Sequence, residues 1–304
     1  MGLSHPQPAA GQAADTITAD FNFVDPAAVV GRPLRFSLDH AWSGIPSVRR
    51  SAPIADACRR AEPPRFDREG FERVRTGVAD IDFNDEAQLN TIWRDGGLEA
   101  VKRLTGAHEV VGWGIGPRYS ERNQTARRTD VTNPARRVHG DFSPTQFGER
   151  LDHADAETLV AQVARGRTLS HWIAVNVWQP VSPPPYDTPL ALCEAGSVQA
   201  DDVLVGRGSV PGAPEFEVDL LLFRHSPDYR WSYFSALEPG EALAFCGLQA
   251  APRGGWRTAP HSAFDNPICP PDAAPRMSVE MRTLALFFDR ARRRPALAAG
   301  SRRA

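Results

Sequence analysis

The second half of this chain is a succession of short strand-like segments with almost no helical pattern between them. These segments are rich in β-branched and aromatic residues and are separated by Gly, Pro and Asp: Ser170–Gln179, Leu190–Cys193, Asp202–Val205, Glu215–Phe223, Trp231–Phe234, Ala242–Cys246 and Ser278–Phe288. Strands that follow one another without intervening helices form antiparallel barrels or sandwiches. The pattern therefore predicts a jelly-roll core.

The preceding part of the chain has a helical pattern. Asp67 is a candidate cap for a helix over Arg68–Val78, and Asn84-Asp85-Glu86 opens a second helix, Ala87–Leu104, that Gly106 closes. Asp155–Val163 is a third, short helix. We expect an α+β fold in which N-terminal helices pack on the jelly-roll. Residues 19–289 are predicted to form a single domain, between a disordered N-terminus (1–18) and a disordered basic tail (290–304).

Composition excludes several classes of partner. The 304 residues are 24% charged with a formal net charge of −2, so nucleic acid and anionic membranes are not expected partners. No apolar run approaches the roughly 20 residues of a membrane span, and the first residues lack a signal-peptide core. The four cysteines are scattered, which is typical of reduced thiols. We expect a cytoplasmic protein.

Three residues have the chemistry of a metal site. His139 and Asp141 are two positions apart, so on a strand both side chains project from one face. His261 lies far downstream, but a jelly-roll brings distant strands side by side. Two imidazoles and one carboxylate form the facial triad of mononuclear non-haem iron(II) oxygenases, which leaves positions open for co-substrate and dioxygen. Zinc uses similar ligands but prefers a tetrahedral site.

A candidate anion site follows His261. On the strand after Pro275, Arg276, Ser278, Glu280 and Arg282 alternate onto one face. Arg276 with Ser278 suits a carboxylate, because a guanidinium pairs bidentately and the hydroxyl adds a donor. Glu280 is expected to neutralise Arg282. The pattern leaves Arg282 open as the alternative anchor, since spacing alone does not tell which arginine lies deeper.

Ordinary structural explanations exist for each of these features. The spacing His-x-Asp also occurs by chance, His261 has the sequence context of a surface loop, and a polar strand face can simply meet solvent. The glycines of Gly112-Trp113-Gly114-Ile115-Gly116 invite comparison with a dinucleotide-binding loop, but no helix follows them. We therefore reject a dinucleotide site and favour the metal site.

The order of several motifs resembles a known family. They are Val138-His139-Gly140-Asp141, Asn176-Val177-Trp178-Gln179-Pro180, Pro189-Leu190-Ala191-Leu192-Cys193, Arg230-Trp231-Ser232-Tyr233-Phe234, Pro260-His261-Ser262-Ala263-Phe264 and Pro275-Arg276-Met277-Ser278-Val279-Glu280-Met281-Arg282. Over about residues 20 to 290 the chain resembles the hydroxylase/desaturase family of fungal and bacterial secondary metabolism, whose members are also described as gibberellin desaturase-like or cephem-methoxylase-related.

This resemblance implies a double-stranded β-helix (cupin-like) fold, Fe(II), 2-oxoglutarate as co-substrate and oxidation of an unactivated C–H bond in a small metabolite. It implies that His139, Asp141 and His261 bind the iron, and that Arg276 with Ser278 holds the 2-oxoglutarate carboxylate. Tyr233 and Asn176 are further candidates for hydrogen bonds in the pocket.

The chain departs from the family at one position of these motifs, because Gln179 stands where the family usually has Arg. If that arginine contacts substrate or co-substrate, the local binding mode differs here.

Two other functions compete with a 2-oxoglutarate-dependent dioxygenase. One is a non-haem iron oxidase with the same ligands that takes all its electrons from substrate. The other is a non-catalytic cupin-like metal-binding protein. The sequence leaves open the substrate, the choice between hydroxylation and desaturation, and the oligomeric state.

Overall fold

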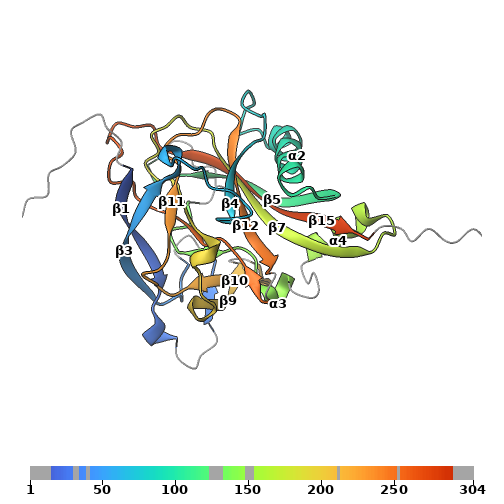
Figure 1. Ribbon diagram of the computed structural model, residues 1–304, viewed down its shortest axis with the longest axis horizontal. Helices are drawn as coiled ribbons and strands as arrows, with labels where there is room; N and C mark the ends of the chain where they lie inside the picture. Colours follow the sequence, from blue (N-terminus) through green and yellow to red (C-terminus); the bar gives the residue numbers. More distant parts are fainter. Residues whose placement is uncertain are drawn as a thin grey trace, which may run out of the picture.

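The computed structural model describes residues 15–29, 34–38, 42–122, 133–147, 154–210, 213–251 and 254–289, and two curled β-sheets dominate them (Figure 1). The larger sheet has nine strands, in the order β1 (Thr16–Val24), β3 (Ser47–Asp56), β11 (Trp231–Tyr233), β8 (Leu190–Cys193), β14 (His261–Ala263), β6 (His139–Gly140), β10 (Ala213–Phe223), β9 (Val203–Val210) and β2 (Leu34–Ser37).

The smaller sheet has six strands. Its order is β13 (Trp256–Arg257), β12 (Glu241–Ala250), β7 (Leu169–Pro180), β15 (Met277–Phe288) and β5 (Glu109–Tyr119), and β4 (Phe71–Arg75) also pairs with β12. The long strands β7 and β15 pair antiparallel along nearly their whole length. This ladder forms the centre of the sheet.

Helical segments cover the smaller sheet on one face. The chain forms α1 (Glu86–Gln88), a π-helical turn (Leu89–Trp93) and α2 (Arg94–Thr105), and α2 lies against β5 and β15 (Figure 1). The other helices are α3 (Pro144–Phe147) and α4 (Ala154–Ala164), beside short 3-10 turns at Pro26–Ala28, Ala57–Arg59, Ala195–Ser197 and Ala200–Asp202. No helix in the described ranges has the length and apolar character to cross a membrane.

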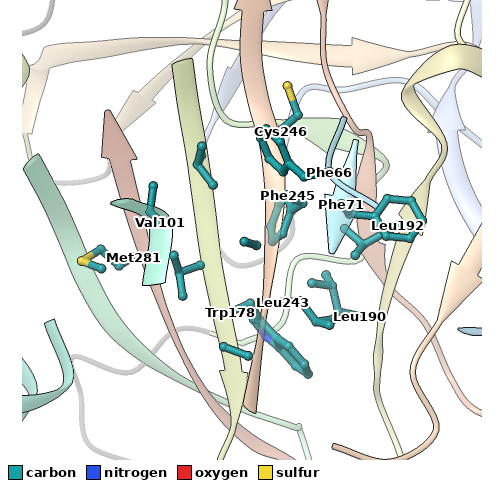
Figure 2. Close-up of a cluster of buried hydrophobic side chains, with 14 of the residues drawn as sticks. Phe66, Phe71, Val101, Trp178, Leu190, Leu192, Leu243, Phe245, Cys246 and Met281 are labelled. Atoms are coloured by element: carbon teal, nitrogen blue, oxygen red, sulfur yellow. The ribbon is translucent and has the colours of Figure 1, made fainter. Parts of the chain in front are cut away.

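Two large apolar clusters stabilise the sheets. One joins the smaller sheet to its neighbours, and Figure 2 shows Val101 of α2 near Met281 of β15, with Leu190 and Leu192 of the larger sheet toward the other end. The other cluster joins residues of the larger sheet to residues of β5, β7, β12 and β15, and in it Phe21 stacks on Trp231 with ring centroids 4.5 Å apart. The backbone N–H of Val138 donates to the carbonyl of Asn22 (3.0 Å), so β1 closes the curl of the larger sheet near β6.

The strands of the second half are confirmed. Each predicted strand overlaps an observed one. Asp202 lies in a 3-10 turn just before β9 and Phe234 just after β11, whereas β9 and β12 extend further than predicted. The helix over Ala87–Leu104 is also confirmed: Asp85 accepts hydrogen bonds from the backbone N–H groups of Ala87 and Gln88, and Gly106 ends the helix with a φ of 70°. The third predicted helix corresponds to α4.

The predicted helical layer is wrong in its first part. Arg68–Val78 contains β4, in which Phe71 pairs with Phe245 of β12. This tertiary pairing overrides the local helical periodicity. The chain before it, for which no helix or strand was predicted, forms β1, β2 and β3. Strand β1 begins at Thr16, inside the segment predicted to be disordered, whereas residues 1–14 and the tail 290–304 lie outside the described residues.

Candidate metal centre

The two predicted histidine ligands lie side by side on neighbouring strands. His139 on β6 and His261 on β14 are direct partners in the antiparallel ladder, and their ring centroids are 4.1 Å apart. Directly opposed residues of antiparallel strands project from the same face. The pairing of two very short strands therefore brings together residues that are distant in the sequence.

Asp141 completes the cluster. The His-x-Asp spacing had predicted that Asp141 continues the strand of His139. Instead, Asp141 follows β6 in a bend. Its Oδ1 lies 3.9 Å from His139 Nε2, and its Oδ2 lies 3.6 Å from His261 Nε2. The three ligand atoms all lie within 4.8 Å of one another. One cation can therefore contact all three.

Both imidazoles are held through their Nδ1 atoms. His139 Nδ1 lies 2.7 Å from the carbonyl oxygen of Arg137, and His261 Nδ1 lies 3.4 Å from that of Ala259. A carbonyl oxygen accepts a hydrogen bond from the protonated Nδ1, which leaves the lone pair of Nε2 for the site. The aromatic rings of Trp42 and Phe245 pack against His139 and His261, with centroids 4.9 and 4.8 Å away. No sequence spacing had linked either aromatic residue to the site.

Burial and neighbouring charges determine the protonation of His139 and Asp141. Burial, aided by neighbouring His261, lowers the pKa of His139 to about 3, so this ring is neutral near pH 7. Burial alone raises the pKa of Asp141, but the charge of Arg282 and the contacts with both histidines outweigh it and hold this pKa well below its usual range. The site thus offers a neutral imidazole at His139 and a carboxylate at Asp141.

The opposite sheet holds the Asp141 carboxylate at both oxygens. Arg282 of β15 donates from Nη2 to Oδ1 at 2.8 Å, and Asn176 of β7 donates from Nδ2 to Oδ2. Asn176 and Arg282 are themselves a directly opposed pair in the β7–β15 ladder. The expected ion pair of Glu280 with Arg282 is wrong, because Glu280 pairs with Arg118 of β5 and Arg282 pairs with Asp141.

Arg276 is a buried cation without a carboxylate partner among the described residues. Arg276 is 2% exposed, and it donates from Nη1 to Ser278 Oγ. Its Nε has no hydrogen-bond partner among the described residues. The guanidinium carbon lies 5.7 Å from the ring centroid of Trp178. Burial lowers the pKa of Arg276 to about 10, so it still carries its charge near pH 7.

Tyr233 does not share the face of the ligands. It pairs with Ala191, which pairs with Ser262, so these three residues project from the face opposite to that of His261. Its ring packs edge-on against Phe264 in the curl of the larger sheet, and burial raises the pKa of its hydroxyl to about 12. The expectation that Tyr233 lines the pocket is therefore wrong.

Gln179 also faces away from the ligands. It lies three positions after Asn176 on β7, so it projects toward the helical layer. Its Oε1 accepts from Thr76 Oγ1 (2.8 Å) and Trp93 Nε1 (2.9 Å), and its Nε2 donates to the carbonyl of Val78 (2.8 Å). Gln179 therefore makes its hydrogen bonds outside the ligand face.

Comparisons with known proteins agree with the motifs. Residues 21–286 match the family described as "Oxidoreductase/YMDC permease-like domain". The hydroxylase/desaturase asaB of Aspergillus flavus is 31% identical over 144 residues, which are 44% of this chain and 63% of that protein, less than two thirds of its length. The hydroxylase/desaturase CTB9 of Cercospora beticola is 30% identical over 241 residues, covering 74% of this chain and 72% of that one.

Two further relatives are named for their cofactors. The alpha-ketoglutarate-dependent dioxygenase tstK of Talaromyces stipitatus is 26% identical over 70% of this chain and 75% of its own. A solved structure, the iron and alpha-ketoglutarate-dependent endoperoxidase NvfI, superposes with a TM-score of 0.71 at 22% identity, over 90% of this chain and 99% of that one. That likeness establishes a shared fold. With the match over residues 21–286 and the similarity to CTB9, this chain belongs to the hydroxylase/desaturase family of oxidoreductases.

Proposed function

We propose that the protein is an Fe(II)- and 2-oxoglutarate-dependent oxygenase that hydroxylates or desaturates a small molecule of secondary metabolism. The observation that carries the proposal is the convergence of His139, Asp141 and His261 within 4.8 Å. Several relatives have names that state this chemistry, among them tstK and the Fe(II)/2-oxoglutarate-dependent dioxygenase nvfI of Aspergillus novofumigatus.

The donor set fits iron. Two imidazole nitrogens and one carboxylate oxygen leave coordination positions open, as a non-haem Fe(II) oxygenase requires. When bound, Fe(II) with 2-oxoglutarate and dioxygen supplies the oxidising power for a C–H bond. The chain contributes position and exclusion of water: Asn176 and Arg282 orient Asp141, while Trp42 and Phe245 pack against the imidazoles.

Arg276 is the proposed anchor for the distal carboxylate of 2-oxoglutarate. A buried guanidinium without an acidic partner requires an anion to offset its desolvation. Ser278 already contacts Arg276 and adds a hydroxyl donor. Arg282 is the weaker candidate, because its charge is paired with Asp141 at 2.8 Å. We therefore assign the co-substrate to Arg276 and the support of the metal ligand to Arg282.

The proposal extends to architecture and location. We propose that the two sheets form a double-stranded β-helix within one domain over residues 19–289, and the ligands between facing sheets and the common fold with NvfI support this. A cytoplasmic location is supported by the free state of Cys58, Cys193, Cys246 and Cys269. A small-molecule substrate and dioxygen are the proposed partners.

The test is 2-oxoglutarate turnover by the purified protein with Fe(II) in air. We expect succinate release and oxygen uptake that increase with a substrate chosen from a metabolite panel, and we expect the His261→Ala variant to abolish both. Oxygen uptake with substrate but without succinate would instead favour the oxidase that does not use 2-oxoglutarate. A folded, iron-loaded protein without any turnover would favour a non-catalytic metal-binding protein.

A further inference from the structure

We propose that Asp187 is a positioning residue that sets the separation between the metal centre and the co-substrate anchor, and thereby the chain length of the 2-oxo acid that fits. The inference rests on the proposed function. Asp187 lies between β7 and β8 and is buried, and it belongs to none of the motifs that predicted the site. Asp187 forms hydrogen bonds with both ends of the segment that connects His261 to Arg276.

The carboxylate of Asp187 holds the backbone at Arg276. Its Oδ1 accepts from the Arg276 N–H at 2.8 Å, and its Oδ2 accepts from Ser120 Oγ at 2.8 Å. Ser120 in turn donates its own N–H to the Arg276 carbonyl at 2.8 Å. Both backbone groups of Arg276 are thus fixed, so the start of β15 aims the guanidinium in one direction.

The backbone of Asp187 holds the other end of the same segment. Its carbonyl oxygen accepts from the N–H of Asn266 at 3.0 Å, and the Asn266 side chain donates to the carbonyl of Tyr186 at 3.0 Å. Asn266 follows shortly after β14, which carries His261. One residue therefore bridges the end near the metal ligand and the end at the anchor.

Arg122 secures the middle of this segment and offsets the buried charge. Its Nη1 lies 3.6 Å from Asp187 Oδ2. Its Nη2 donates to the carbonyls of Pro271 (2.6 Å) and Ala273 (3.1 Å). The segment is consequently held at three places, and Asp187 takes part in all three connections.

The functional consequence follows from the shape of the co-substrate. A 2-oxo dicarboxylic acid bound at the proposed site would contact the metal at one end and Arg276 at the other, so the distance between these two groups would select the number of carbons between its ends. Displacing a positioned group by about 1 Å lowers activity about a hundredfold in enzymes. Removing the hydrogen bonds of Asp187 should therefore reduce the discrimination between 2-oxo acids of different chain length more than it reduces Fe(II) affinity.

The experiment compares two co-substrates in the full-length holoenzyme. The probes are 2-oxoglutarate, which yields succinate, and 2-oxoadipate, which is one carbon longer and yields glutarate. For Asp187→Ala we expect the ratio of their kcat/KM values to fall about tenfold, chiefly through a higher KM for 2-oxoglutarate, because the Arg276 N–H loses its acceptor. Fe(II) affinity should stay within about twofold of the native value.

Asp187→Asn provides the conservative rescue. An asparagine retains an acceptor for the Arg276 N–H, so we expect most of the length selectivity to return. The matched control is Asp219→Ala, which removes another buried carboxylate that is bonded to Arg207 and Thr145 and lies on the opposite sheet face from His139. Asp219→Ala should lower the free energy of unfolding without changing the ratio of the kcat/KM values for 2-oxoglutarate and 2-oxoadipate.

The outcomes separate the two proposals. Native protein that does not consume 2-oxoglutarate overturns the proposed function and this inference with it. Native turnover combined with an unchanged ratio in Asp187→Ala overturns the inference alone. Where Asp187→Ala does not fold, Ser120→Ala removes one of the same bonds, and an unchanged ratio in that variant overturns the inference equally.

Discussion

At the scale of single residues, the charges around the site divide into paired and unpaired ones. Arg282 pairs with Asp141 and Arg118 pairs with Glu280, whereas Arg276 has no carboxylate within ion-pair distance in the part of the chain that the structure describes. A buried cation in this state favours binding of an anion, because the anion replaces the lost hydration. On this contrast we propose different tasks for Arg276, just before β15, and Arg282, on β15.

Arg276→Gln tests the assignment. We expect kcat/KM for 2-oxoglutarate to fall about a hundredfold, because a charge-assisted pair with the carboxylate is replaced by a neutral amide. Succinate release measures it. Arg49→Gln, which removes an exposed arginine paired with Asp20, is the control and should behave as native. A fall of less than about twofold in Arg276→Gln would reject Arg276 as the anchor.

Asn176→Ala tests the support of Asp141. The variant loses the donor to Asp141 Oδ2, and removal of a partner that orients a metal ligand lowers metal affinity about 10- to 100-fold. Anaerobic Fe(II) titration gives the dissociation constant. The control is Asn90→Ala in the π-helical turn, where the amide is exposed and donates to a backbone carbonyl. Equal Fe(II) affinity in native and Asn176→Ala proteins would argue against this role.

At the scale of the elements, alternation along a strand predicted which side chains share a face, but it did not predict which residues those side chains contact. Alternation along β15 correctly placed Ser278, Glu280 and Arg282 opposite to Val279 and Met281. The partner of Arg282 was missed because it comes from the facing sheet, and the packing of two sheets is not encoded in the spacing along one strand. Strands β6 and β14 are too short for a recognisable pattern.

Strand β7 separates structural from functional side chains by its two faces. Asn176 faces the metal ligands, and Gln179 faces Thr76 and Trp93. In Gln179→Leu the Trp93 N–H loses its acceptor, so the free energy of unfolding should fall by about 3 kcal/mol. Denaturant unfolding measures this. The KM for 2-oxoglutarate should not change, and a large rise in KM would place Gln179 in the site.

At the scale of the whole molecule, the motifs predicted the strand-rich second half and the ligand set, but not the N-terminal contribution to the larger sheet. Residues Ile17, Ala19, Phe21 and Phe23 alternate with exposed or half-buried ones in β1, and this signal was present in the sequence. The strand forms because β1 pairs with β3 and because the carbonyl of Asn22 accepts a hydrogen bond from the Val138 N–H next to β6. Such long-range pairings depend on the completed fold.

Stability of the metal-free protein should depend on pH. His139 has a pKa of about 3 when folded and about 6.5 when unfolded, so below pH 6.5 the unfolded chain binds a proton that the folded chain does not. The free energy of unfolding should therefore decrease as the pH falls from about 6.5 toward 4.5. Denaturant unfolding with a chelator at both pH values measures it.

The variant His139→Asn is the control for this dependence. Asparagine does not titrate, so the decrease between the two pH values should become smaller. An equally steep decrease in native protein and variant would mean that other groups produce it.

The proposed function requires that iron and 2-oxoglutarate bind next to each other at His139, Asp141 and His261. Anaerobic titration of the metal-free protein with Fe(II) and 2-oxoglutarate, followed by visible absorption, tests it most directly. We expect a weak metal-to-ligand charge-transfer band that forms only when both are present, and that requires a much higher 2-oxoglutarate concentration in Arg276→Gln. A well-folded native protein that gives no band under saturating Fe(II) and 2-oxoglutarate would overturn the proposed function.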